Sequence, residues 1–166
     1  RNGDGQINEE DLYRFKRPAP TYYLGVTSDL SYKNWSLAFA GRVHLGNYVY
    51  NNISSMNGEL SRLYRLEGPY LSNIHRDALV SGFNNAQYLS DYYIQNGSFF
   101  KMDHITLGYN FGNVLGGSTN LSVSAIVQNA FIITRYTGLD PEHANGIDNN
   151  LYPRPRNFVM SVNLQF

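Results

Sequence analysis

Hydrophobic and polar residues alternate with a period of two along five stretches of the chain. In the last of them, Met160, Val162 and Leu164 alternate with Ser, Asn and Gln. Such alternation is typical of β-strands that have one apolar and one polar face. The sequence therefore predicts five strands, at residues 22–32, 35–46, 99–111, 120–131 and 158–166.

The predicted strands are long, and their polar faces carry small side chains. Most hold about 10 to 14 residues, whereas strands of soluble proteins usually hold about 5 to 6. A tilted strand needs about 9 to 11 residues to cross a bilayer. The polar faces consist mostly of Ser, Thr, Asn and Gly, which suits a wall between lipid and a wet interior. We predict an all-β, antiparallel up-and-down transmembrane β-barrel segment. The alternative is a soluble carbohydrate-binding β-sandwich, in which the apolar face is a core.

Short and long connections alternate between these strands. Lys33 and Asn34 form a tight turn, and residues 112–117 make the second short link. The long connections are 51–98 and 132–157. Bacterial outer-membrane barrels have short periplasmic turns and long extracellular loops. The predicted extracellular segments are therefore about 1–20, 51–98 and 132–157, with Phe166 at the periplasmic rim as a C-terminal assembly signal.

No helix of convincing length is expected in the strand regions, and short helical turns are expected within the first long connection. Residues 60–66 and 74–80 could each form a helical turn or two. No stretch approaches the roughly 18 consecutive apolar residues of a membrane-spanning helix. The chain starts at Arg1 within a turn-like motif and without a basic-then-apolar leader, so we expect it to be part of a longer protein.

The composition fits a barrel wall and excludes several other classes of protein. The 166 residues include 13 Lys+Arg and 13 Asp+Glu, and only 16% are charged against about 25% in an average globular domain. Zero net charge argues against a general nucleic-acid binder or a polybasic membrane-surface protein. The absence of Cys excludes disulfides, thiolate metal sites and a cysteine nucleophile. The sequence has no nucleophile elbow, Walker loop or dinucleotide fingerprint, so we predict that the chain is not an enzyme.

The first eleven residues resemble part of a calcium-binding loop. Asn2 and Asp4 would supply the third and fifth positions of an EF-hand loop, and Asp11 its last ligand. The first acidic ligand of that pattern is missing from the chain. The loop therefore predicts either a Ca²⁺ site or a Gly-rich surface turn, and no other cofactor is expected.

Several polar residues are candidates for contact with a substrate. Asp29, Arg42 and His44 lie on the polar faces of the predicted strands. Lys101 and Asp103 are further candidates, but they share parity with the apolar Ile105, which indicates a β-bulge nearby.

The predicted outer loops are rich in Tyr beside Asn, Asp and Arg, a combination that can stack on sugar rings and bind hydroxyls. The alternative for such tyrosines is the aromatic girdle of a barrel. We select Tyr136, Asp140 and Glu142 as the candidates from the last loop.

Several motifs together resemble one family. In chain order they are Asn2-Gly3-Asp4-Gly5-x-Ile7, Pro18-x-Pro20-Thr21-Tyr22, Gly46-Asn47-x-x-Tyr50-Asn51, Gly97-Ser98-Phe99-Phe100-Lys101-Met102-x-x-Ile105-x-Leu107-Gly108-Tyr109, Gln128-Asn129-x-Phe131-x-x-Thr134-x-Tyr136-x-Gly138-x-Asp140-Pro141-Glu142 and Tyr152-Pro153-x-Pro155-Arg156. Their order and spacing resemble the C-terminal barrel portion of the SusC/RagA-type TonB-dependent outer-membrane transporters of Bacteroidetes.

The resemblance implies an integral protein of the bacterial outer membrane and a barrel of 22 strands, of which this chain would supply about the last five. It implies as partners the remainder of the same barrel with its plug, a SusD-type surface lipoprotein and the TonB complex. The implied substrates are glycan oligosaccharides or peptides, and the family has no common catalytic residues to carry over.

Five strands cannot close a barrel, since even the smallest single-chain barrels have eight. Open edges are not tolerated in lipid, so either the rest of the barrel closes it or several copies do. A structural translocator closed by homo-oligomerisation is therefore the other membrane alternative.

Overall fold

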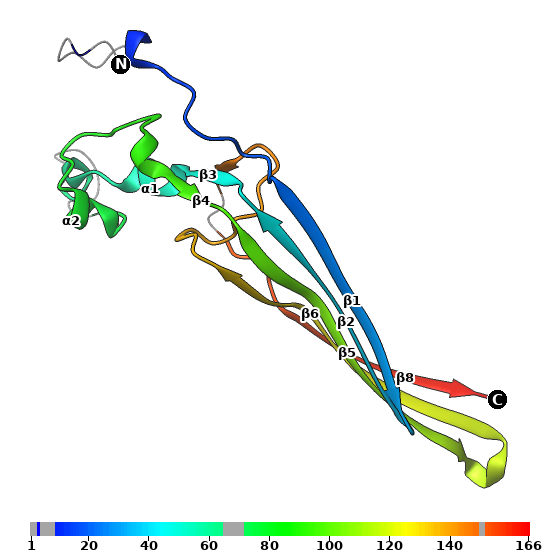
Figure 1. Ribbon diagram of the computed structural model, residues 1–166. Helices are drawn as coiled ribbons and strands as arrows, with labels where there is room; N and C mark the ends of the chain where they lie inside the picture. The colour runs from blue at the N-terminus through cyan, green and yellow to red at the C-terminus, as the bar shows by residue number, and fades with distance from the viewer. Residues whose placement is uncertain (1–2, 4–8, 65–71, 150–151) are drawn as a thin grey trace.

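The computed structural model describes residues 3, 9–64, 72–149 and 152–166, and it centres on one long antiparallel sheet (Figure 1). The strands of this sheet are β1 (Tyr22–Tyr32), β2 (Trp35–Leu45), β5 (Phe99–Val114), β6 (Thr119–Thr134) and β8 (Asn157–Gln165). They lie side by side in the order β1-β2-β5-β6-β8, which is also their order along the chain. The five predicted strands and the up-and-down arrangement are confirmed.

The register places the alternating residues on two continuous faces. Leu24, Val43, Phe100 and Ile133 face one side, and the same side continues through Phe158 on β8. The opposite side carries most of the Ser, Thr, Asn and His residues of the same strands. The apolar side chains are exposed, with Phe158 and Met160 each 75% accessible. No second sheet packs on this face among the described residues, so the two-layer β-sandwich is not the architecture of this chain.

A β-bulge on β5 changes which residues face the polar side. Lys101 lies opposite Arg42, and His104 lies opposite Ala40, with the register shifting between these two pairs. The extra residue is Asp103. Lys101 and His104 therefore share one face despite their opposite parity, and the bulge predicted from the alternation is confirmed.

Two strand ends differ from the sequence prediction by more than one residue. β5 continues to Val114 rather than ending at Phe111, because a second shift between Asn110 and Gly112 interrupts the alternation. β6 continues to Thr134 rather than ending at Phe131, past an irregular stretch where Asn129 has a φ of 52°. Consequently the second short connection is 115–118, not 112–117.

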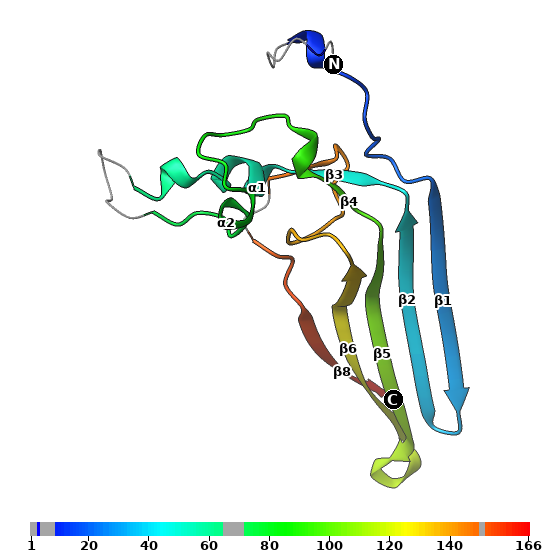
Figure 2. The ribbon, with the colours of Figure 1, turned by 60° about the vertical axis from the view of Figure 1, so that its left-hand side comes forward.

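The two ends of the sheet carry different connections (Figures 1 and 2). The tight turn at Lys33 and Asn34 lies at one end, together with the 3-10 helix Leu115–Gly117 between β5 and β6. Gln165 pairs with Asn120, so the chain ends at this same end. The described parts of the long connections and of the segment that precedes β1 all lie at the opposite end. This separation confirms the predicted alternation of short and long connections, while the extracellular assignment stays a prediction.

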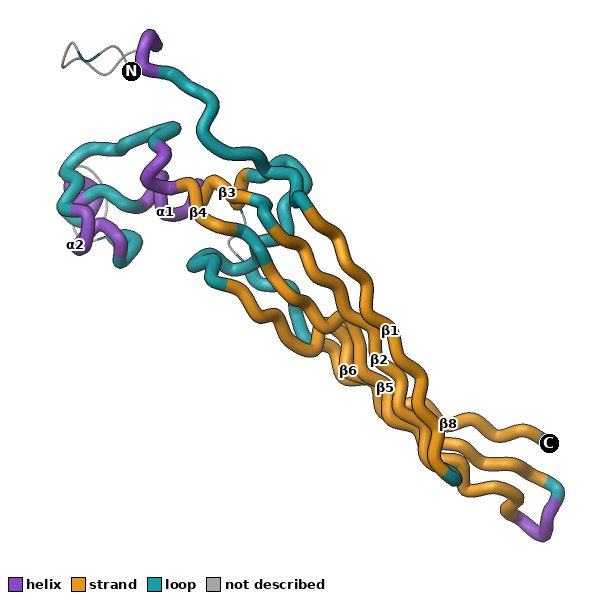
Figure 3. The backbone as a smooth tube through the Cα atoms, in the orientation of Figure 1, coloured by secondary structure: helices purple, strands orange, loops and turns teal. Residues whose placement is uncertain are grey.

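The first long connection folds into a small module of its own. It contains β3 (Tyr48–Asn51), α1 (Asn52–Asn57), α2 (Asp77–Ser81) and β4 (Ile94–Asn96), and 3-10 helices at Leu60–Arg62 and Asp91–Tyr93. A third strand, β7 (Ile147–Asp148), joins from the second long connection, which gives the order β4-β3-β7. A further 3-10 helix at this end is Glu9–Asp11, and among the residues that the structure describes, helices are confined to the two ends of the sheet (Figure 3).

Local residues explain the module. The side chain of Asn51 accepts a 2.9 Å hydrogen bond from the Ser54 amide and so caps α1. Gly82 ends α2 in the left-handed conformation that glycine adopts without strain. Val49 and Tyr93, with 1% and 2% exposure, form the core, and it is here rather than on the sheet that the chain is densely packed. No helix of the described residues has the length and apolar character needed to cross a membrane.

Candidate functional site

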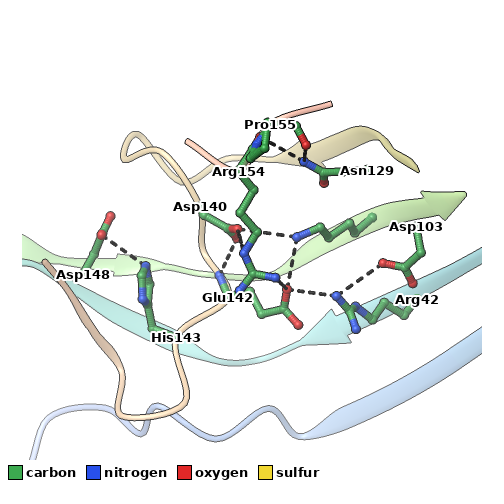
Figure 4. Close-up of polar contacts among 10 residues, drawn as sticks. Arg42, Asp103, Asn129, Asp140, Glu142, His143, Asp148, Arg154 and Pro155 are labelled. Carbon is green, nitrogen blue, oxygen red and sulfur yellow. Dashed lines mark hydrogen bonds and ion pairs between the residues drawn. The ribbon is translucent and has the colours of Figure 1, made fainter. Parts of the chain in front are cut away.

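The second long connection folds back against the polar face of the sheet, near the end that carries the long loops. Tyr136 is buried directly after β6, and its ring lies over Gly138, where a Cβ atom would be only 2.3 Å from the ring. Only glycine therefore allows this turn. The turn delivers Asp140 and Glu142 to β5, as Figure 4 shows.

Glu142 is the centre of an ion network in which three cations meet one carboxylate oxygen. Its Oε2 lies 3.1 Å from Lys101 Nζ and 3.0 Å from an Arg42 guanidinium nitrogen. The third cation is Arg154, whose nearest guanidinium nitrogen is 3.3 Å away. Lys101 comes from β5, Arg42 from β2 and Arg154 from the segment before β8, so the network joins three separate parts of the chain.

Two further carboxylates complete the network. Asp140 Oδ2 lies 3.4 Å from Lys101 Nζ and 3.1 Å from Arg154 Nε. Asp103, the bulge residue, lies 3.3 Å from Arg42. Three cations thus face three anions, and the network is balanced in charge.

Burial makes the network more than a set of surface ion pairs. The side chains of Lys101 and Asp140 are 4% and 8% exposed, and that of Glu142 is 21% exposed. Removing one partner from a buried ion pair leaves an uncompensated charge and typically costs about 3 to 5 kcal/mol. Arg154 is held in place through its backbone, since Asn129 Nδ2 donates to its carbonyl at 3.0 Å. The network therefore fixes the second long connection to the sheet.

A second polar cluster anchors the far end of the same connection. The hydroxyl of Tyr136 donates to Asp148 Oδ2 at 2.7 Å, and Asp148 is 1% exposed. Burial raises the pKa of Tyr136 well above its ordinary value, and the hydrogen bond to Asp148 raises it further. His143 Nε2 lies 3.2 Å from Asp148 Oδ1 without the geometry of a hydrogen bond. Tyr136 is therefore a neutral donor to a buried carboxylate at neutral pH.

The structure brings some predicted site residues together and separates others. Arg42, Asp140 and Glu142 meet in the ion network, and Tyr136 belongs to the neighbouring cluster. His44 lies next to the network, with its ring 4.7 Å from the ring of Tyr23. The residues are thus close, but whether they contact a substrate stays a prediction.

Asp29 lies apart from the ion network. It is exposed on β1 opposite Ala38, closer to the tight turn. Phe166 follows β8 and is 92% exposed, and its role in assembly stays a prediction.

The calcium prediction falls mainly outside the described residues. Asn2 and Asp4 are not among them, whereas Asp11 ends the 3-10 helix Glu9–Asp11. Among the described residues, no group of three or more His, Cys, Asp or Glu side chains is placed to hold a metal ion. Calcium binding by the first eleven residues therefore stays a prediction.

One constellation in the loop module has the residue types of a catalytic triad but not its geometry. Ser54 Oγ lies 3.3 Å from both ring nitrogens of His75, and His75 Nδ1 lies 3.3 Å from Asp77. An oxygen that is equally far from both nitrogens is not aligned with either lone pair. Ser54 is also fully buried, so a substrate cannot reach it. These residues hold α1 against the start of α2.

A cavity of about 230 Å³ separates this module from the second long connection. It is lined by Asn51, Ile53, His75, Thr137, Gly138, Leu139 and Asp148. Thr137 and Asp148 already have partners within the chain, in Gln95 and Tyr136, whereas Nδ2 of Asn51 is buried without a hydrogen-bond partner. The surface of the cavity is mostly apolar.

The fold defines the class of protein. A single antiparallel sheet with an exposed apolar face, a polar face of small residues, and short and long connections at opposite ends is a segment of a transmembrane β-barrel wall. β1 and β8 are the edges of this sheet and each pairs with one long strand, so the sheet is open.

Comparisons with known proteins identify the barrel more closely. No family model matches the chain. TonB-dependent receptor SusC of Bacteroides thetaiotaomicron is 42% identical over 171 aligned residues, which cover 100% of this chain and 17% of that protein. TonB-dependent receptor P3 of Formosa agariphila is 25% identical, over 99% of this chain and 18% of that protein. The chain belongs to the SusC/RagA-type TonB-dependent receptors of the outer membrane, and it spans less than a fifth of the length of these relatives.

Solved structures agree with this assignment at the level of the fold. The structure of the RagAB peptide importer in the open-open state matches with a TM-score of 0.71 and 20% identity, over 97% of this chain and 19% of that one. The closed-closed state of the same importer matches with a TM-score of 0.67. The strand arrangement of this chain is thus that of a segment of a much larger barrel.

Proposed function

We propose that this chain is part of a TonB-dependent importer that takes nutrients across the outer membrane, with glycan oligosaccharides as the first candidate substrate. The observation that carries the proposal is the 42% identity to SusC over the whole chain. The long connections would face the outside and the polar face would line the interior. The chain acts by binding and gating, without bond chemistry.

The proposal includes partners outside this chain. The remaining strands and a plug would close the barrel, because an open sheet edge leaves backbone groups unpaired in lipid. A SusD-type surface lipoprotein would cover the outer opening, and the TonB complex would supply the energy. In the competing arrangement, several copies of this segment would close one barrel. The open edges at β1 and β8 are equally compatible with it.

Peptides are the second candidate substrate. The solved structures with the same fold belong to an importer described as taking up peptides, but the identity to it is 20%. The exposed Tyr side chains at the loop end, such as Tyr23 and Tyr92, favour sugars, because aromatic rings stack on the apolar faces of sugar rings.

Uptake by the whole receptor tests this proposal. Cells that express the full-length receptor, and cells deleted for it, are given fluorescent oligosaccharides, neutral and acidic, or fluorescent peptides. We expect receptor-dependent uptake of oligosaccharides that stops when the proton gradient is dissipated. Receptor-dependent uptake of peptides alone would select the second candidate, and uptake that is equal in both strains would refute import.

The assembly is tested by native mass spectrometry of the purified complex. A single large barrel chain with a lipoprotein is expected. A homo-oligomer of a short chain would establish the competing arrangement.

A further inference from the structure

The ion network has an unusual division between fixed and movable parts. Lys101 and Arg42 are on β5 and β2, and Arg154 is held by the hydrogen bond from Asn129 to its backbone carbonyl. The anion at their centre, Glu142, comes instead from residues 135–146, which have no regular secondary structure. Lys101 and Arg42 are thus part of the wall and Arg154 is tied to β6 through its backbone, whereas the carboxylate that these cations bind is delivered by a loop.

Removal of the Glu142 carboxylate would leave a site ready for another anion. Three cations would then face only Asp140 and Asp103, which leaves a local charge of about +1 by Coulomb bookkeeping. The nitrogen atoms now within 3.0 to 3.3 Å of Glu142 Oε2 would converge on empty space. Charge-assisted bonds from Arg and Lys are the usual means of binding a carboxylate.

The position is accessible from the polar face. The side chains of Arg42 and Arg154 are 37% and 53% exposed. Gly25 lies directly opposite Arg42 on β1, and no atom lies within 4 Å of where its Cβ would be. A ligand can therefore approach Arg42 over Gly25 without displacing protein atoms of this segment.

Aromatic rings flank this open position on the same face. Tyr23 is 63% exposed and packs edge-on against His44 at 4.7 Å, while His44 lies 4.6 Å from Phe99. Tyr23 and Gly25 are two residues apart on one strand, roughly 6 to 7 Å, which is about the width of a sugar ring. A ring stacked on Tyr23 would thus bring a carboxylate on its edge to Arg42.

We propose that Glu142 occupies the binding position of a uronic acid residue: the ligand carboxylate replaces that of Glu142 between Arg42, Lys101 and Arg154 while its ring stacks on Tyr23. The exchange frees the second long connection from the sheet. This inference rests on the proposed import of oligosaccharides and narrows it to acidic glycans. The flanking rings favour a uronate over the carboxylate of a peptide, which has no ring at that position.

Binding of two matched probes to the full-length receptor tests the inference. D-galacturonate and its methyl ester share one ring and differ in that the ester has a methyl group in place of the negative charge, and both are titrated against the wild type and Glu142→Ala. In the wild type, galacturonate can bind only when Glu142 has left the three cations. If this open state has a population of about a tenth, removal of the Glu142 carboxylate strengthens galacturonate binding about tenfold. The methyl ester is expected to bind both proteins equally weakly. Equal affinities of the two proteins for galacturonate would overturn the proposal.

Acetate tests the same position without a sugar. In titration calorimetry, millimolar sodium acetate is expected to give a heat of binding with Glu142→Ala, whereas sodium chloride at the same ionic strength is not. Glu59→Ala is the matched control, because it removes a carboxylate that pairs with Arg62 at 2.9 Å in the loop module. Acetate should have no effect on this control. Failure of acetate to act on Glu142→Ala would contradict an exchangeable anion position.

Further measurements separate the possible failures. Adding Arg42→Gln to Glu142→Ala should abolish the gain in galacturonate affinity. Binding of N-acetylalanine in place of galacturonate would overturn the assignment to a sugar. Receptor-dependent uptake of neutral oligosaccharides without any of these anion effects would refute this inference alone, and absence of all uptake would refute the proposed function.

Discussion

Lys101 is the residue whose removal should most weaken the attachment of the second long connection to the sheet. It is 3% exposed and provides one ammonium group to both Asp140 and Glu142. Lys101→Met keeps the length of the side chain and its apolar contacts but removes the charge. Asp140 and Glu142 then remain as neighbouring anions, with Arg42 and Arg154 as their cations.

The expected cost follows from the burial of the network. Loss of one partner of a buried ion pair typically costs about 3 to 5 kcal/mol. Because both carboxylates keep an arginine partner, we expect about 3 kcal/mol, the lower end of this range. At 1.4 kcal/mol per factor of ten, this is a change of about 150-fold in the equilibrium for local opening.

Amide hydrogen exchange of the full-length receptor measures this opening directly, because exchange reports local as well as global unfolding. Protection of residues 137–148 should fall about 150-fold in Lys101→Met, while protection of the strands stays unchanged. Lys33→Met is the matched control, since Lys33 lies in the tight turn at the opposite end of the sheet. A loss of less than about threefold in Lys101→Met, which is below 0.7 kcal/mol, would refute the view that the network holds this connection.

Four further predictions concern the fold and the neighbouring cluster. The pKa of Tyr136 is raised in the folded protein. The stability that protonated Tyr136 contributes is therefore complete below the ordinary tyrosine pKa of about 10 and is lost as the pH rises above that value. Hydrogen exchange of residues 137–148 should show this pH dependence in the wild type and not in Tyr136→Phe. The same variant removes a donor to the buried Asp148 and should cost about 1.5 to 3 kcal/mol at neutral pH, which the same measurement detects. Val162→Arg places a charge on the lipid face and should lower the stability of the barrel by about 2 to 4 kcal/mol. Heat-modifiability gels should therefore show less folded barrel. Asn163→Arg is the control, because Asn163 faces the interior and this variant should assemble normally. Gly146→Ala, at a φ of 73°, should lower the protection of β7 by at least the roughly 1 kcal/mol of a left-handed non-glycine residue, and unchanged protection would contradict this.

The long sheet could be predicted from the sequence because each of its strands repeats the same local rule. Alternation determines the face of a residue without knowledge of its neighbours, and it holds for the nine residues of β8 as for the eleven of β1. The small sheet was not predicted, since β7 has two residues and β4 has three, too few to establish a period. α1 was missed because its six residues show no helical periodicity, and its cap at Asn51 is a common local pattern.

The ion network could be predicted only in part, and the bulge at Asp103 explains why. Strand parity placed Arg42 on the polar face, and the parity that the charged Lys101 shares with the apolar Ile105 correctly indicated a bulge. The bulge turns Lys101 toward Arg42, and Glu142 then joins the two cations from a connection 41 residues further along the chain than Lys101. Arg154 was not selected, because it lies outside every alternating stretch and its position depends on a backbone contact with Asn129. Period-two patterns therefore specify the wall of this barrel, whereas the polar site depends on where that pattern is interrupted.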